Sequence, residues 1–166
     1  MTFAPRTWVV GEVVSAAIMN QEIRDQFNSM FAAWTSYTPT WTAPTTNPVI
    51  GANGTLTGRY LKLGRTVICE INVIAGASTT WGSGSYNWLL PVAAANAGIS
   101  VVGHAHILGT DRWAGQVVVS PNATTVGAFF PISATSTKVD FANATRPETA
   151  NASTQIRLFF VYESAT

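Results

Sequence analysis

Residues 54–75 read GTLTGRYLKLGRTVICEINVIA, and the second half of this stretch alternates between two kinds of side chain. One set is Val67, Cys69, Ile71 and Val73, and the other is Thr66, Ile68, Glu70 and Asn72. A period of two predicts a β-strand with one buried face, while Ile68 and Ile74 indicate that the other face is partly covered too. The segment LKLG, residues 61–64, separates this strand from an earlier one, so we predict a β-hairpin.

Six more segments downstream have the apolar and β-branched composition of strands. They are YNWLLPV (86–92), ISVVGHAHIL (99–108), WAGQVVVS (113–120), TTVGAFFPI (124–132), KVDFA (138–142) and TQIRLFFVYE (154–163). Clusters of Gly, Pro, Asn and Ser separate them. About eight strands with this spacing predict a mainly β protein with an antiparallel β-sandwich or jelly-roll head.

A helical pattern precedes the strands. Ser15 is a suitable N-cap for a helix from about Ala16 to Ala33. A heptad-like 4-3 spacing links Ala16, Asn20, Ile23, Phe27, Met30 and Trp34. We predict a short, coiled-coil-like helix that joins three chains. Its trimerisation residues are Asn20, Ile23, Phe27, Met30 and Trp34, with Asn20 fixing the register.

The same apolar stripe can instead pack on the chain's own β-domain. It has fewer than three full heptads, so association through it would need help from the neighbouring domain. Pro39, Pro44 and Pro48 stop any helix and keep the following chain extended. We therefore divide the chain into an N-terminal segment with the helix, residues 1–36, and a β-sandwich head, residues 37–166.

Charged residues are scarce in this protein. They make up 10% of the 166 residues, against roughly 25% in typical globular proteins. None occurs from Ile71 to Thr110. A domain that buries surface against copies of itself needs fewer charges, which favours oligomerisation, although a surface rich in Thr and Asn can also be soluble alone.

Charge and hydropathy also limit the partners. The net charge is +1 and the basic residues are scattered, which argues against nucleic-acid binding. No apolar run reaches the roughly 18 residues of a membrane span. Cys69 is the only cysteine, and the first residues lack the layout of a signal peptide. We expect assembly in a cytoplasm, or export without a cleaved signal.

Two segments carry a family resemblance. The lead follows W-x-x-G-E-x-x-x-A-x-x-x-N-x-x-x-R-D over residues 8–25, and the hairpin follows G-R-Y-x-x-x-G-R-x-V over residues 58–67. With YTPTWT between them and the β-rich remainder, most of the chain resembles tail-fibre and minor tail proteins of phages of actinobacteria.

This resemblance implies a virion protein assembled in the host cytoplasm. Its N-terminal segment would dock on other virion proteins, its helix would form a homotrimer, and its head would face outward. The expected role is a tail fibre or receptor-binding protein that contacts host-surface glycan. A capsid-attached fibre or decoration protein with a purely structural role is the alternative.

His104 and His106 would point to the same side of a predicted strand. At a three-fold axis, three such pairs would supply six imidazoles, enough for an octahedral transition metal, and phage needle tips and fibres that look similar use His-x-His in this way. The simpler interpretation is two histidines hydrogen-bonded to neighbours on a sheet face or interface. We expect no metal and no cofactor.

Hydrolysis of host polysaccharide would need two carboxylates roughly 5–10 Å apart. The acidic residues of the β-region are Glu70, Asp111, Asp140, Glu148 and Glu163. None of them belongs to a recognisable motif. Cys69 lies in the middle of an alternating strand, where a small core residue is expected rather than a nucleophile. We therefore expect no enzymatic activity.

Four aromatic residues are candidates for glycan binding: Trp81, Tyr86, Trp88 and Trp113. Aromatic faces stack on the apolar faces of sugars, and the segment TTWGSGSYNW, residues 79–88, is loop-like. The alternative is that these side chains fill the core or the trimer interface. Because Trp81 lies in a segment without strand alternation, we expect it to be the least buried tryptophan.

Overall fold

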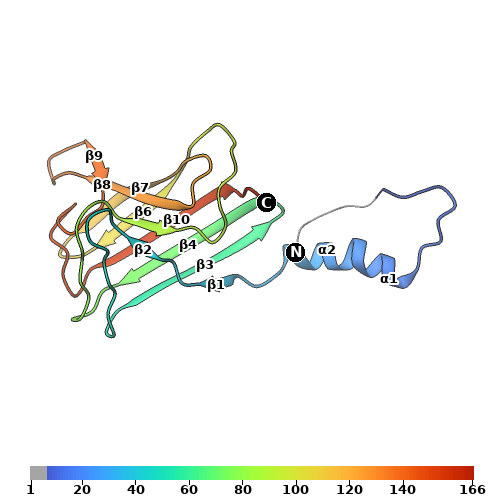
Figure 1. Ribbon diagram of the computed structural model, residues 1–166, viewed down its shortest axis with the longest axis horizontal. Helices are drawn as coiled ribbons and strands as arrows, with labels where there is room; N and C mark the ends of the chain where they lie inside the picture. Colours follow the sequence, from blue (N-terminus) through green and yellow to red (C-terminus); the bar gives the residue numbers. More distant parts are fainter. Residues whose placement is uncertain (1–6) are drawn as a thin grey trace.

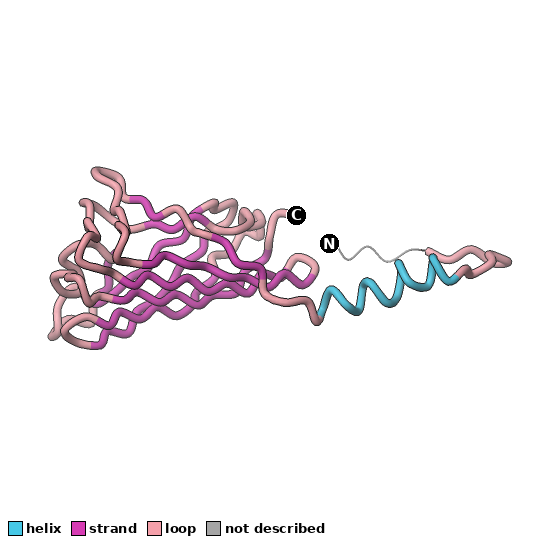
Figure 2. Tube along the Cα trace, turned by 90° about the horizontal axis from the view of Figure 1, so that it is seen from below, coloured by secondary structure: helices cyan, strands magenta, loops and turns pink. Residues whose placement is uncertain are grey.

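The computed structural model of the protein describes residues 7–166 and contains one N-terminal helix followed by a β-domain (Figure 1). The helix extends away from the β-domain, and the strands and the helix both run along the long axis (Figure 2). The C-terminus lies at the end of the β-domain nearer the helix (Figure 1). The expectation of a mainly β protein with one short helix is confirmed.

The helix consists of α1 (Ala16–Met19), a π-helical turn, η1 (Asn20–Arg24), and α2 (Asp25–Met30). Ser15 caps its start as predicted, because the Ser15 hydroxyl accepts a hydrogen bond from the Ile18 backbone N–H at 3.3 Å. The wider π turn interrupts a strict heptad spacing. Residues before η1 are therefore rotated about the axis relative to those after it.

The predicted end of the helix is wrong, since α2 ends at Met30 rather than near Ala33. Trp34 consequently lies outside the helix and does not continue its seam. The physical reason is the start of β1 (Thr35–Tyr37), which pairs with β3 and requires an extended chain. Instead, the Arg59 guanidinium lies over the Trp34 ring, 4.9 Å from its centroid.

Within residues 7–166, ten strands form one antiparallel sheet. After β1 they are β2 (Trp41–Thr42), β3 (Thr55–Leu63), β4 (Thr66–Ile74), β5 (Asn87–Leu89), β6 (Val101–Leu108), β7 (Arg112–Val119), β8 (Thr125–Pro131), β9 (Val139–Phe141) and β10 (Gln155–Glu163). Their order is β1-β3-β4-β10-β6-β7-β8-β5-β2, with β9 paired to β8. Each of the eight strands predicted from sequence corresponds to one of β3–β10.

The sheet is curled. β1 and β2 lie at opposite ends of the strand order, yet only residues 38–40 separate them in the chain. Four Cα–Cα steps span at most about 14 Å, so the two edges must come close together. The sheet also begins at Thr35, so the domain boundary that we placed after residue 36 falls inside β1.

The alternating residues build the core on the inner side of the curl. In β4 the alternating small and apolar set, Val67 to Val73, is at most 1% exposed, whereas Ile74 on the other face is 38% exposed. The partners of this set come from other strands: Trp88, Val117, Val126, Phe130, Ile156, Leu158 and Phe160. The hairpin pattern therefore identified the buried face correctly.

Two glycines of the G-R-Y-x-x-x-G-R segment have specific tasks. Gly64 has a φ of 60° in the two-residue turn between β3 and β4, a conformation that favours glycine. Gly58 pairs with Tyr37, and a Cβ there would lie 2.4 Å from the Tyr37 ring. The Tyr37 ring thus occupies the space that a side chain at residue 58 would fill. The Tyr37 hydroxyl lies 3.3 Å from Cys69 Sγ.

We predict that a chain beginning at Ala33 folds without the helix. Among the described residues, the buried ones begin only at Pro39, and the Tyr37 contacts with Gly58 and Cys69 are retained in such a chain. Calorimetry should show one cooperative transition, with the full chain as control. Loss of a cooperative transition would mean that the helix completes the core.

Candidate functional site

The apolar face of the helix is uncovered. Ile23 is 41% exposed, Phe27 59% and Met30 50%, and Asn20 is exposed as well. The β-domain of the same chain therefore does not bury Ile23, Phe27 or Met30, although Trp34, the last residue of the predicted stripe, contacts Arg59 of that domain. Three large apolar side chains on one side of a helix form a surface suited to association.

The described part of the lead is also apolar and exposed. Val9 is 70% exposed, Val10 103% and Val13 84%, with Trp8 at 43%. Covering these apolar side chains with another surface is favourable, because it removes apolar area from water. The lead is thus a second candidate contact surface, at the far end of the helix from the head (Figure 1).

The candidate glycan-binding aromatics mostly form an internal cluster around Trp41. Its ring is stacked on Trp88 at 6.1 Å and meets Trp81 at 5.6 Å and Tyr86 at 5.0 Å edge to face. Tyr86 is 1% exposed and Trp88 0%. The expectation that Tyr86 and Trp88 contact glycan is therefore wrong for the described chain. Both are core residues because the inner face of the curl covers them.

Trp81 and Trp113 are half-buried and keep part of each side chain at the surface. The Trp81 carbonyl accepts a hydrogen bond from the Tyr86 hydroxyl at 2.7 Å, and Trp113 Nε1 donates to Glu148 Oε2 at 3.0 Å. Trp8 is 43% exposed, whereas Trp81 is half-buried. The expectation that Trp81 is the least buried tryptophan is therefore wrong. Trp81 packs because it lies against Trp41.

Both half-buried tryptophans lie at the tip of the domain opposite the helix. Tyr37, next to the helix, pairs with Gly58, so the other end of β3 is remote from the helix. The loops 43–54 and 75–86 leave the sheet at that end and are joined by an antiparallel bridge between Val49 and Thr80. Trp113 follows the β6–β7 turn at the same end. The Thr110 backbone N–H in this turn donates a hydrogen bond to Glu148 Oε1 at 2.7 Å.

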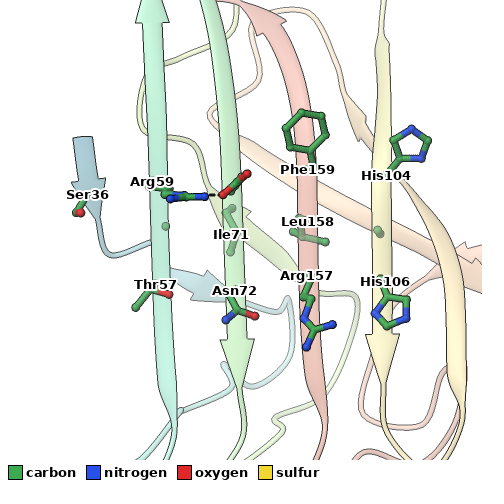
Figure 3. Close-up of a pocket in the computed structure, with 13 residues that line it drawn as sticks. Ser36, Thr57, Arg59, Ile71, Asn72, His104, His106, Arg157, Leu158 and Phe159 are labelled. Carbon is green, nitrogen blue, oxygen red and sulfur yellow. Dashed lines mark hydrogen bonds and ion pairs between the residues drawn. The ribbon is translucent and has the colours of Figure 1, made fainter. Parts of the chain in front are cut away.

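His104 and His106 lie on the outer face of β6, as the period of two predicted. They border a groove of about 610 Å³ that crosses β3, β4, β10 and β6 (Figure 3). Arg157 and Phe159 project from β10 into the same groove, next to the histidines. Sequence reasoning identified the histidines and missed Arg157, because the pairing of β10 with β6 joins segments far apart in the chain.

The groove contains polar groups without partners in the described chain. Asn72 Oδ1 and His106 Nδ1 are shielded from water and form no hydrogen bond. Burial lowers the pKa of His106, and the nearby charges of Arg157 and Arg112 lower it further. Glu70 also borders the groove, but its carboxylate is paired with Arg59 at 2.6 Å.

Most β-domain carboxylates form structural contacts. Asp140 pairs with Arg146 at 2.8 Å and Glu163 with Arg65 at 3.1 Å, in addition to the Glu70 and Glu148 contacts. Cys69 is fully buried as expected, and burial raises the pKa of its thiol to about 11. A thiol in this state is a poor nucleophile at neutral pH.

Within residues 7–166, no cluster of three or more His, Cys, Asp or Glu side chains could hold a metal ion. A site shared by His104 and His106 of three chains would draw its ligands from other copies, so the absence of metal stays a prediction. None of the helical segments described has the length and apolar character needed to cross a membrane.

Comparison with family models, curated proteins and solved structures finds no match for this chain.

We predict that Trp81→Ala lowers the free energy of unfolding by roughly 1–3 kcal/mol, because it removes a half-buried ring from the Trp41 cluster. Chemical denaturation measures this. Val49→Ala, in the adjoining loop and 58% exposed, is the matched control and should change stability little. Unchanged stability would contradict the assignment of Trp81 to the Trp41 cluster.

We predict that Arg157→Gln raises the pKa of His106 toward its ordinary value of about 6.5, because one of the charges that lower it is gone. An NMR titration of the imidazole signals measures the shift, and His104→Gln assigns them. In the protein without this substitution, the pKa of His106 is lower in the folded chain than in the unfolded chain. As the pH falls, the unfolded chain therefore binds the proton first. The contribution of His106 to stability is therefore present above about pH 6.5 and decreases below it. An unchanged His106 pKa would contradict the assigned cause.

Proposed function

We propose that this protein is a non-enzymatic virion protein of a phage, a homotrimeric tail fibre or receptor-binding protein. The observation that carries the proposal is the helix that extends from the head with Ile23, Phe27 and Met30 exposed. A helix of this length is marginal in water on its own. Its apolar face gains stability when copies of the same helix cover it, and the resemblance to phage fibre proteins sets the number of chains at three.

Contacts between the heads would supplement the short helix. Leu89, Ile99 and Val102 are 42%, 67% and 65% exposed and belong to the charge-free span 71–110. Val102 lies near the start of β6 and pairs with Val118 near the end of β7. This end of the two strands is the one nearer the helix. Exposed apolar side chains in a span without charge suit contact between neighbouring heads, because interface centres are depleted of charge.

The head is proposed to be a β-sandwich of the jelly-roll type. The curled sheet supports this, since its two halves face each other across the core and its two edges are joined by residues 38–40. Strands that run along the axis of the helix give an elongated head. Such a head carries its tip loops away from the point of attachment (Figure 2).

The two ends of the molecule have different proposed partners. The exposed apolar lead, including Val10 and Val13, would dock on other virion proteins. The tip loops with Trp81 and Trp113 face away from the helix and would approach the host surface. The non-enzymatic role is supported by the structural contacts of Glu70, Asp140 and Glu148.

Light scattering tests the trimer. The native protein at micromolar concentration should have about three times the 17.7 kDa chain mass. Phe27→Asp should reduce the mass to that of one chain, because it places a charge in the helix contact. The β-sheet circular dichroism should persist, since Phe27 is 59% exposed in the single chain and supports no core.

Asn28→Asp is the matched control, because this residue is exposed beside Phe27 and lies off the apolar stripe. It should leave the mass unchanged. A monomeric native protein, or a Phe27→Asp variant that keeps the trimer mass, would contradict association through the helix. Antibody labelling of virions tests the location: label on tail fibres supports the proposed role, and label on the capsid favours a decoration protein.

A further inference from the structure

The groove on the outer face of β3, β4, β10 and β6 has an unusual row of side chains at its centre. The register places Arg157 beside Asn72 on one neighbouring strand and beside His106 on the other. Cross-strand neighbours on one face lie roughly 5 Å apart, so these three side chains can act on one small ligand. Figure 3 shows them projecting to the same side of the sheet.

Arg157 carries a charge without an acidic partner. Its guanidinium donates a hydrogen bond to Gln155 Oε1 at 2.6 Å and forms no ion pair in the part of the chain that the structure describes. By contrast, Arg59, Arg65 and Arg146 each pair with a carboxylate. A guanidinium is built for bidentate contact with a carboxylate or a similar planar anion, so Arg157 offers an unused anion-binding group.

The two side chains that flank Arg157, Asn72 and His106, are polar and half-buried. Asn72 Oδ1 and His106 Nδ1 are shielded from water and without hydrogen-bond partners. These two atoms are closed to a ligand as well, so the exposed remainder of each half-buried side chain is the part that can meet ligand hydroxyl groups. His106 is kept neutral by burial and by Arg157, so its ring can share a hydrogen bond with a hydroxyl.

An apolar platform completes the groove. Phe159 stands two positions from Arg157 on β10, between Glu70 and His104 in the next cross-strand row, and is 43% exposed. Its ring can stack on the C–H face of a sugar. The volume of about 610 Å³ lies within the range of small-ligand sites, roughly 300–1,000 Å³.

We propose that this groove binds a carboxylated sugar residue of host-surface polysaccharide. The carboxylate lies on Arg157, the hydroxyls meet Asn72 and His106, and the ring stacks on Phe159. This inference rests on the proposed role as a virion protein that contacts host glycan and names the chemical class of that glycan. The Glu70 carboxylate does not oppose an anion here, because Arg59 neutralises it at 2.6 Å.

The test uses the full chain and two matched oligosaccharides. One alternates glucose and glucuronate residues, and the other is its carboxyl-reduced, all-glucose counterpart. Titration calorimetry should detect binding of the first and at least tenfold weaker binding of the second. Arg157→Gln should weaken binding of the first roughly ten- to a hundredfold, the loss expected for a charge-assisted hydrogen bond. Arg65→Gln, which removes a surface arginine of another strand end, should leave binding unchanged.

Equal binding of the two oligosaccharides, or no effect of Arg157→Gln, would overturn the proposal. So would an Arg157→Gln variant that loses its oligomeric state, because the groove would then be a contact between copies of the chain. Light scattering on the same samples separates the two proposals. A trimer that binds neither oligosaccharide overturns the groove alone, and a monomer that binds the glucuronate chain overturns the trimer alone.

Discussion

The closure of the sheet is the constraint on which the rest of this structure depends. β1 and β2 occupy opposite ends of the strand order but are joined by residues 38–40. The chain leaving the helix must therefore add a strand to one edge and reach the other edge at once. This forces the curl, encloses the inner faces, and places Trp41 in the core beside Trp88. Tyr37 can pack against β3 at the start of this connection, because Gly58 has no side chain and leaves space for the Tyr37 ring.

Local pattern was enough to predict the strands and the buried face of the central hairpin. Alternation in residues 66–73 depends only on neighbours in the chain, and burial at 1% or less follows it. The helix start was predictable for the same reason, since Ser15 acts on the Ile18 N–H three residues away. The helix end was not, because β1 pairs with β3 and that pairing is a tertiary contact.

The candidate sites were less predictable, because they depend on which strands become neighbours. Tyr86 and Trp88 belong both to a predicted strand, residues 86–92, and to a loop-like segment, residues 79–88, and closure of the sheet buries both against Trp41. Arg157 gave no signal of its own. Arg157 lies between Asn72 and His106 because β10 lies between β4 and β6 in the sheet. The alternation of residues within one strand does not specify which distant strand becomes its neighbour.

The charge distribution connects these features. The Arg59–Glu70 ion pair joins two strands that border the groove, whereas Leu89, Ile99 and Val102 lie exposed in a span without charge. Desolvating a charged surface is costly, and covering an apolar one is favourable. If the helices associate through Phe27, these exposed apolar side chains of the head can be covered at little cost. The groove with Arg157 is then the part that is better left open to a polar ligand.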